Sequence, residues 1–281
     1  MKIQRVDVKP LLNEEQLESL QFQLLNSSHG TLIEQSTLVT CGSLKALFLK
    51  AEGDGPIREQ AYRYALRALR LMKFNPAKNS ERQSIMQSLI GSDLLLGWLS
   101  PRNPKREDWL RKGDRDQLFL AMRLVPLLQD FEFAMERYMP DYWNFHLAQA
   151  QRLVRPADQR FKTLFRVQDP FQREMLERWD ATRYYHFLGT KSFSTITLNH
   201  NIVFGAHDDG RNVPDTLSCL TALGDYAGGT LCFPRLGVSF KLRPRDLLIA
   251  DTNTEYHGSV GNIGGERYSV VAYMHKSLLP R

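Results

Sequence analysis

The sequence has few cysteines and no long apolar run. Its three cysteines, Cys41, Cys219 and Cys232, include no CxxC pair, which argues against both a disulfide framework and a thiolate zinc site. The first residues, MKIQRVDVKPLLNEEQ, lack the apolar segment of a secretory signal, and no stretch approaches the roughly 20 apolar residues of a membrane span. We therefore expect an intracellular protein, nuclear in a eukaryote and cytoplasmic in a bacterium or virus, that does not associate with membranes.

Internal repeats and low-complexity tracts are absent as well. What is present can form a full core, since 281 residues with 42% hydrophobic content fit one large domain or two small ones. The net charge of +6 and the pI near 9.2 lean weakly toward a polyanionic partner. Nothing in the sequence points to an obligate protein partner.

The first half of the chain is typical of helices with a few strands. Residues 31–50 predict two strands that turn at Cys41 and Gly42. Pro56 occupies a favoured first position of a helix that places small apolar residues on one stripe and arginines on another. The first stripe is Ala61, Ala65, Ala68 and Met72, and the second is Arg63, Arg67 and Arg70. The arginines could bind phosphates, but we favour a solvated helix face.

The predicted secondary structure changes from mainly helical to β at about residue 160. Before it, a charged loop at 100–114 precedes two expected helices at 114–139 and 141–154, interrupted by Pro126 and Pro140. After it come seven short apolar runs bounded by turn residues, which predict an all-β sandwich or barrel. The runs are RFKTLF, FSTITLNHNIVF, TLSCLTAL, GTLCFP, GVSFKL, DLLIAD and RYSVVAYMH. We expect one unit over residues 1–281, with a helical and β support region at 1–160 and a β core at 161–281.

A candidate metal site begins in the stretch GAHDDGRN at residues 205–212. A strand directs side chains i and i+2 to the same face, so His207 and Asp209 can bind one ion while Asp208 points away. Asp208 and Arg211 are expected to face solvent. Most short polar runs after a strand are only turns, and a lone HxD pair is expected by chance at roughly even odds.

His257, in DTNTEYHGSV, can supply a third ligand after a segment long enough for several strands. Two histidines and one carboxylate form the facial triad of non-haem Fe(II) oxygenases, which leaves positions open for a co-substrate and dioxygen. Copper and zinc accept the same ligands, so the ligand types alone do not select iron.

Two residues further along select the iron chemistry. Arg267 lies ten residues after His257, and Ser269 falls on the same strand face as Arg267. A guanidinium and a hydroxyl placed in this way suit the distal carboxylate of 2-oxoglutarate. The ordered set of HxD, His, Arg and Ser is far more specific than any part of it, with chance odds below about one in ten.

The same strand carries a second group of candidates. Tyr273 and His275 share the parity of Arg267, so a ring and an imidazole would be directed into one cavity, provided that no bulge intervenes. Asn212, three residues after Asp209, can approach from the other rim. A ring for stacking, with an amide and an imidazole for edge contacts, suits a flipped base. Taken alone, Tyr273 would be a half-buried strand tyrosine and His275 a rim histidine.

Three stretches carry a wider pattern: HxDxxN at 207–212, GDYAGGTLCFPRLGVSF at 224–240 and RYSVVAYMHK at 267–276. Together they resemble the TET/JBP family of Fe(II)- and 2-oxoglutarate-dependent dioxygenases, which oxidise the 5-methyl group of 5-methylcytosine or thymine in nucleic acid. The resemblance covers about residues 190–281, and the helical FAMERYMPDYWNFHLAQA before it is only loosely similar. It implies an α+β fold, in which a double-stranded β-helix (jelly-roll) barrel is supported by an N-terminal, mainly helical region.

The resemblance also implies Fe(II), 2-oxoglutarate and O2 as cofactors, and DNA with a flipped or single-stranded pyrimidine base as the partner. The chain would then be a 2-oxoglutarate-dependent dioxygenase, similar to the methylcytosine dioxygenases. By matching position, the residues that resemble the iron ligands and catalytic centre are His207, Asp209 and His257; those that resemble co-substrate contacts are Arg267, Ser269 and Asn199; and those that resemble base contacts are Asn212, Tyr273 and His275.

The sequence departs from the family pattern in two places. Three scattered cysteines cannot form the cysteine-rich zinc-binding region of the animal members, so residues that grip a duplex would come from the N-terminal half. The PxGD turn that is common before the distal histidine is PRD here. Arg245 therefore stands where glycine is usual, and the turn must avoid a positive φ or bear its cost.

Several alternatives stay open. The triad and Arg267 do not define the substrate, so an oxygenase acting on a protein side chain or a small molecule is a rival, as is a non-catalytic barrel that recognises modified nucleic acid. An amide can donate or accept after a flip, so Asn212 does not separate thymine from 5-methylcytosine. The resemblance to the cytosine-acting branch favours 5-methylcytosine, oxidised to 5-hydroxymethylcytosine.

Overall fold

The structure is a computed structural model that describes residues 2–26, 30–42, 44–51, 56–72, 75–76, 92–97, 115–152, 190–276 and 279. The expected loop at 100–114 and the run RFKTLF at 160–165 lie outside these residues. The helices are α1 (Glu14–Ser19), α2 (Pro56–Leu71), α4 (Arg115–Tyr138) and α5 (Pro140–Arg152). The strands are β1 (Gln4–Asp7), β2 (Thr31–Ile33), β3 (Thr37–Cys41), β4 (Leu44–Leu49), β5 (Asn75–Pro76), β6 (Ser92–Gly97), β7 (Thr195–His200), β8 (Ser218–Phe233), β9 (Val238–Phe240), β10 (Leu247–Ala250) and β11 (Gly258–Tyr273).

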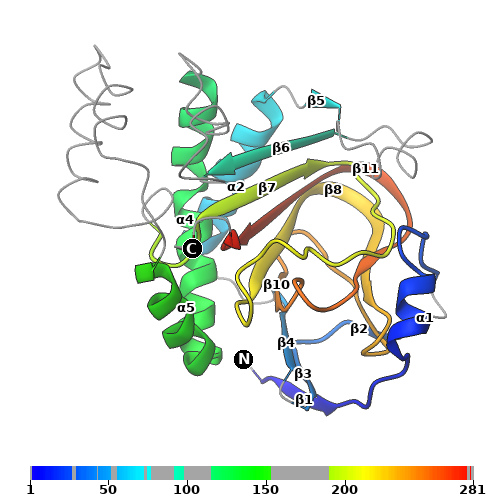
Figure 1. Ribbon diagram of the computed structural model, residues 1–281. Helices are drawn as coiled ribbons and strands as arrows, with labels where there is room; N and C mark the ends of the chain where they lie inside the picture. Colours follow the sequence, from blue (N-terminus) through cyan, green and yellow to red (C-terminus); the bar gives the residue numbers. More distant parts are fainter. Residues whose placement is uncertain are drawn as a thin grey trace.

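The described strands form one mixed sheet that curls into a partial barrel, with α2, α4 and α5 on its outer side (Figure 1). The strand order is β1-β3-β4-β10-β8-β11-β7-β6-β5, and β9 joins β8 to β2 beside this path. The centre of the sheet is the antiparallel pair β8 and β11, flanked by β10 on one side and β7 on the other. None of the described helices is long and apolar enough to cross a lipid bilayer.

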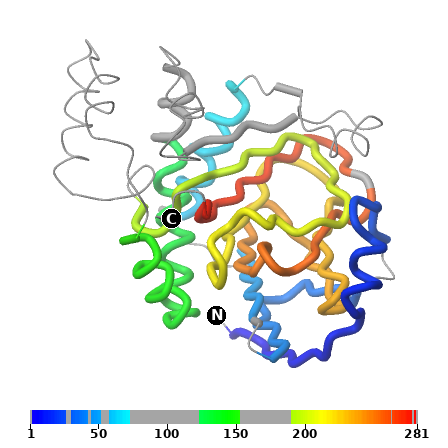
Figure 2. Tube along the Cα trace, in the orientation of Figure 1, coloured from blue at the N-terminus to red at the C-terminus, as the bar shows by residue number. Residues whose placement is uncertain are grey.

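Strands from the N-terminal part belong to the same sheet. β4 pairs with β10 in antiparallel register from Leu49↔Leu247 to Ala46↔Ala250, and β3 and β1 continue outward from β4. Figure 2 shows this N-terminal trace, in blue, running beside the orange segment that contains β10. The predicted turn at Cys41 and Gly42 is confirmed between β3 and β4. The residues before it form two strands instead of one, because β2 is separate from β3 and pairs with β9. The division of the chain at residue 160 stays a prediction.

Strand alternation separates two cores. Leu247 and Ile249 of β10 pack toward α2 and α4, whereas Leu248 and Ala250 face the interior of the curl. Burying each large apolar side chain stabilises the fold by about 1.5–3 kcal/mol, so this period of two fixes the register of β10. The polar residues of the candidate site lie on strands and loops held by these two cores.

Helix α2 follows the predicted amphipathic pattern. Ala61, Ala65 and Ala68 are buried in the core shared with α4. The arginine stripe of Arg63, Arg67 and Arg70 is exposed, as expected for a solvated face. One member has a tertiary contact, since Arg70 Nε lies 2.7 Å from Glu266 Oε2 on β11.

The expected interruption at Pro126 is wrong, because α4 runs through it. A proline inside a helix costs about 3 kcal/mol. Neighbouring residues of the same helix are fully buried, and each contributes about 1.5–3 kcal/mol: Leu124, Leu127, Leu128 and Phe131. Their packing outweighs the local cost. Pro140 behaves as predicted and begins α5.

Two of the predicted runs, TLSCLTAL and GTLCFP, are one strand rather than two. The residues between them, GDYAG at 224–228, are typical of a turn, but β8 is one strand of 16 residues that runs through them. β11 pairs with β8 from Cys232↔Gly258 to Cys219↔Ala272, with an irregularity only between Val260 and Ile263. Tertiary pairing therefore overrides the local turn signal. At the PRD turn, Arg245 adopts a φ of 78° and so bears the cost of the missing glycine.

His146 of α5 anchors this helix to the start of β8. Its Nε2 accepts the backbone N–H of Leu217 at 2.7 Å, and complete burial lowers its pKa from the ordinary 6.5 to about 3. The folded state thus disfavours protonation of His146, while the unfolded chain takes up a proton below pH 6.5. Stability from this group is present at pH 7 and is lost as the pH falls toward 3.

We expect His146→Gln, whose amide oxygen can accept the same N–H, to reduce the acid sensitivity of folding. Between pH 7 and pH 5 the wild type should lose about 2 kcal/mol more unfolding free energy than the variant. Urea denaturation at the two pH values measures the difference. Equal losses in both proteins would contradict a neutral, buried His146.

Candidate metal centre

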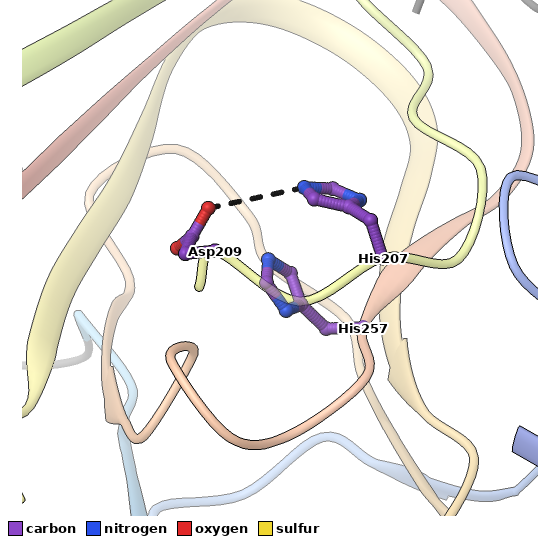
Figure 3. A group of neighbouring side chains, drawn as sticks. All are labelled: His207, Asp209 and His257. Atoms are coloured by element: carbon purple, nitrogen blue, oxygen red, sulfur yellow. Dashed lines mark ion pairs between the residues drawn. The ribbon is translucent and has the colours of Figure 1, made fainter. Parts of the chain in front are cut away.

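The structure brings His207, Asp209 and His257 together. His207 lies in the connection between β7 and β8, and His257 directly precedes β11. One potential ligand atom from each of the three side chains lies within 4.8 Å of the others (Figure 3). The two imidazole rings have centroids 4.5 Å apart.

A small backbone bridge joins the two histidines. His207 N–H donates to His257 O at 3.0 Å, and His257 N–H donates to His207 O at 2.8 Å. The HxD motif therefore lies in a bridged loop and not in a regular strand, which corrects the reasoning from strand alternation. The expected result holds nevertheless, because Asp209 turns toward His207 while Asp208 is exposed. Arg211 is exposed as predicted.

Backbone carbonyls set the tautomer of both rings. His207 Nδ1 lies 2.8 Å from Gly205 O, and His257 Nδ1 lies 2.9 Å from Glu255 O. A carbonyl oxygen only accepts, so each Nδ1 carries the proton and each Nε2 keeps its lone pair. Both rings therefore present the form that binds a metal ion.

The carboxylate of Asp209 is held by Thr252. Thr252 Oγ1 donates to Asp209 Oδ2 at 2.5 Å, and the Asp209 N–H donates to Thr252 O at 2.8 Å. The other oxygen, Oδ1, faces His207 Nε2 at 4.0 Å. Asp209 thus offers one oxygen to an ion between the three side chains while its second oxygen is committed to the protein.

An ion pair behind His257 fixes its loop. The Glu255 side chain is 1% exposed and pairs with Arg235, which also lies 3.2 Å from Glu14 of α1. The ring of Phe233 stacks on that of His257 with centroids 5.7 Å apart. Sequence reasoning missed Thr252, Arg235 and Glu255, because single polar residues in loops carry no periodic signal.

A buried cation lies on β11 close to this group. Arg267 is 6% exposed, its Nε has no hydrogen-bond partner among the described residues, and no carboxylate is among the charges acting on it. Burial lowers the pKa of its guanidinium, and the ring of Tyr226 on β8 lies 5.6 Å from its Cζ. The guanidinium is hydrogen-bonded to the Tyr226 side chain but has no carboxylate partner among the described residues, and a buried cation without a counter-charge is costly unless a ligand accompanies it. The site is therefore built for an anion.

The other two predicted co-substrate contacts, Ser269 and Asn199, are neighbours of each other. Ser269 pairs with Asn199 of β7 in the sheet, and Asn199 Nδ2 donates to Ser269 Oγ at 3.1 Å. Asn199 Oδ1 is buried without a hydrogen-bond partner among the described residues. Exchanging the two ends of this amide would let Ser269 donate to Oδ1 and would free an N–H donor for an anion.

Among the three predicted base contacts, His275 neighbours both of the others. Asn212 and His275 form an isolated antiparallel bridge, just beyond the end of β11. Tyr273 is half-buried on the interior side of β11, with its hydroxyl 3.3 Å from Thr197 Oγ1 and its ring 6.4 Å from that of His275. β11 ends at Tyr273, so His275 continues the face through this bridge and not as part of the strand.

Comparison with known proteins gives a consistent result. A family model, Tet_JBP, described as the oxygenase domain of the 2OGFeDO superfamily, matches residues 135–276, about half of the chain. The chain is 31% identical over 138 residues to the bifunctional helicase and thymine dioxygenase JBP2 of Leishmania infantum, covering 47% of this chain and 12% of that protein. It is 33% identical over 92 residues to the thymine dioxygenase JBP1 of Trypanosoma brucei brucei, covering 31% of this chain and 11% of that protein.

These matches cover only about an eighth of the length of the curated relatives. Among solved structures, the fold is similar to that of NgTET1 in complex with 5mC DNA, with a TM-score of 0.54 and 12% identity, covering 96% of this chain and 94% of that chain. At this identity the likeness concerns the fold, and it confirms the predicted double-stranded β-helix.

Proposed function

Because this chain belongs to the TET/JBP family of Fe(II)- and 2-oxoglutarate-dependent oxygenase domains, we propose that it oxidises the 5-methyl group of a pyrimidine base in DNA, with 5-methylcytosine as the preferred base. As a member of this family, it is a 2-oxoglutarate-dependent dioxygenase domain that uses Fe(II) and O2. The observation that carries the proposal is the bridge that places Asn212 and His275 together beside Tyr273.

The donor set fits Fe(II) and a dicarboxylate. His207, Asp209 and His257 each have one possible ligand atom close enough to the others to bind one ion, and two histidines with one carboxylate are the ligand types of the facial triad of non-haem Fe(II) oxygenases. The buried guanidinium of Arg267, which has no carboxylate partner among the described residues, suits the distal carboxylate of 2-oxoglutarate. Ser269 lies two residues further along the same strand and is hydrogen-bonded to Asn199. When bound, the iron with its co-substrates supplies the oxidant that replaces a methyl hydrogen with a hydroxyl group.

The remaining residues orient the base. A methyl group in a stacked duplex is out of reach, so the base must flip out or already be single-stranded. Stacking on an aromatic ring contributes about 1–3 kcal/mol per base, which is comparable to the few kcal/mol that flipping costs. We assign stacking to Tyr273 and edge contacts to Asn212 and His275.

Mass spectrometry of nucleosides tests this proposal. The protein would be incubated with Fe(II), 2-oxoglutarate and an oligonucleotide that contains both thymine and 5-methylcytosine. We expect 5-methylcytosine to gain the mass of one oxygen atom. Consumption of 2-oxoglutarate without any oxidised base would contradict the proposal and would favour a protein side chain or a small molecule as substrate.

Thymine is the second candidate base. It is favoured by the curated relatives, which are thymine dioxygenases by name at 31% and 33% identity. The same experiment distinguishes the two bases, because the added oxygen would then appear on thymine.

Gly229 of β8 provides a test of the co-substrate site. A Cβ at this position would lie 3.0 Å from Arg267 Nη1, and its φ is +67°. We expect Gly229→Ala to displace the guanidinium and to raise the KM for 2-oxoglutarate about fivefold to tenfold, roughly the loss of one hydrogen bond. Steady-state kinetics at varied 2-oxoglutarate concentrations measure this change.

Gly261→Ala is the matched control. Its φ of +74° imposes similar backbone strain, but a Cβ there meets nothing within 4 Å. Both variants should lose similar stability, about 1–2 kcal/mol, and only Gly229→Ala should change the KM. An equal change of KM in both would show that backbone strain, and not contact with Arg267, is responsible.

A further inference from the structure

A chain of hydrogen bonds connects the proposed base contact to the proposed metal ligand. Asn212 Nδ2 lies 3.2 Å from Ser218 Oγ and 3.3 Å from Thr252 Oγ1. Ser218 Oγ lies 2.7 Å from Thr252 Oγ1, and Thr252 Oγ1 lies 2.5 Å from Asp209 Oδ2. Asn212, Ser218 and Thr252 are buried, so their polar atoms have to find hydrogen-bond partners within this network.

The carboxylate at one end fixes the direction of the whole chain. An ionised Asp209 only accepts, so Thr252 spends its single proton on Oδ2. The lone pairs of Thr252 then receive the proton of Ser218 and one N–H of Asn212. A remaining lone pair of Ser218 also faces the NH2 group of Asn212. All four groups are satisfied only when the NH2 of Asn212 points inward.

A flipped amide would break this pattern. Its oxygen would face Thr252, which has no proton left, and Ser218, which could donate to the amide only by abandoning Thr252. The 2.7 Å contact between the two hydroxyls would then join two oxygens without a proton between them. Loss of a buried hydrogen bond costs about 1–3 kcal/mol, so the network excludes the flip.

The carbonyl oxygen of Asn212 is therefore the atom left for a ligand. This oxygen accepts no hydrogen bond from the described residues. It is not fully buried, so it keeps some contact with solvent. On the basis of the proposed function, we propose that Ser218 and Thr252 position the Asn212 side chain and thereby determine which base is bound. They lock Asn212 as an acceptor, which selects the 4-amino group of 5-methylcytosine over the 4-carbonyl of thymine.

Binding without metal tests this proposal independently of turnover. Fluorescence anisotropy would compare two short single-stranded oligonucleotides that differ only in one central base, 5-methylcytosine or thymine. We expect the full-length wild type to bind the 5-methylcytosine strand about tenfold more tightly, the value of one well-matched base contact.

Thr252→Val is the decisive variant. This variant removes the hydroxyl that accepts hydrogen bonds from Ser218 and Asn212. Ser218 can then either donate to Asn212 or accept from it, so the Asn212 amide can adopt both orientations. The ratio of the two affinities, 5-methylcytosine strand over thymine strand, should then fall to near one, mainly because the thymine strand binds more tightly. A gain of thymine affinity is not expected from a general loss of structure.

Three further variants complete the test. Thr252→Ser keeps the hydroxyl and should keep the preference, and so should Thr254→Val, which removes an exposed hydroxyl that donates to Asp251 at 2.5 Å. If Thr252→Val does not fold, Thr252→Ala removes the same hydroxyl. A wild-type preference near one, or a preference that survives loss of the Thr252 hydroxyl, would overturn the proposal. Failure to oxidise any base, with the binding preference intact, would reject the proposed function alone.

Discussion

Asp209→Ala is expected to lower both Fe(II) affinity and turnover of 2-oxoglutarate by on the order of a thousandfold or more. Loss of a residue that only supports a metal ligand typically costs about 10–100-fold, so loss of the ligand itself should cost more. The variant also leaves Thr252 Oγ1 without the acceptor it uses at 2.5 Å. Metal affinity can be measured by titration under anaerobic conditions, and turnover by release of succinate.

The neighbouring carboxylate is the control for this prediction. Asp208 is exposed by surface area, although the surrounding loop desolvates its carboxylate in part, and this desolvation together with the charge of Asp209 raises its pKa. Asp208→Ala removes the same charge one position away and should leave metal affinity near that of the wild type. If the two variants lost affinity equally, the general negative potential of this loop would be the cause, and Asp209 would not be a ligand.

Arg267→Met is expected to have two effects of opposite sign. The KM for 2-oxoglutarate should rise by about 100-fold or more, because two charge-assisted hydrogen bonds to a carboxylate contribute about 1.5–3 kcal/mol each. The protein without ligands should become more stable, by on the order of 1 kcal/mol, because a buried cation with no described carboxylate partner is replaced by an apolar side chain. Kinetics and thermal unfolding measure the two effects.

Arg243→Met tests whether any loss of positive charge has these effects. Arg243 is exposed and lies 3.7 Å from Glu34. Its replacement should change neither the KM nor the stability by more than a small amount. Loss of stability in Arg267→Met would indicate that the guanidinium is satisfied within the protein and is not kept for a ligand.

The part of the site on β11 could be predicted because a strand has a fixed period of two. Arg267, Ser269 and Tyr273 share one face of β11, and Asn199 is directly opposite Ser269 on β7. The grouping of the three candidate metal ligands could be predicted from residue type and order, although strand alternation predicts HxD on a strand where the structure has a loop.

Other features depend on contacts that no local pattern encodes. The continuity of β8 through its glycines follows from pairing with β11, and the continuity of α4 through Pro126 follows from burial of its neighbours. The network of Asn212, Ser218 and Thr252 joins three separate segments of the chain. Hydroxyl groups are common in loops, so only the three-dimensional arrangement shows which of them act together.

The backbone bridge between His207 and His257 orders the segment between them, so part of the entropy cost of bringing the two histidines together belongs to folding and not to metal binding. Closing a flexible loop of about 50 residues costs on the order of 3.5 kcal/mol, and the two mutual hydrogen bonds of the bridge, which join backbone atoms and use no metal-ligand atom, help to offset that cost. An incoming ion does not have to gather its ligands from a disordered chain. Its affinity should therefore reflect the chemistry of two imidazoles and a carboxylate, and removing the metal should leave the site assembled.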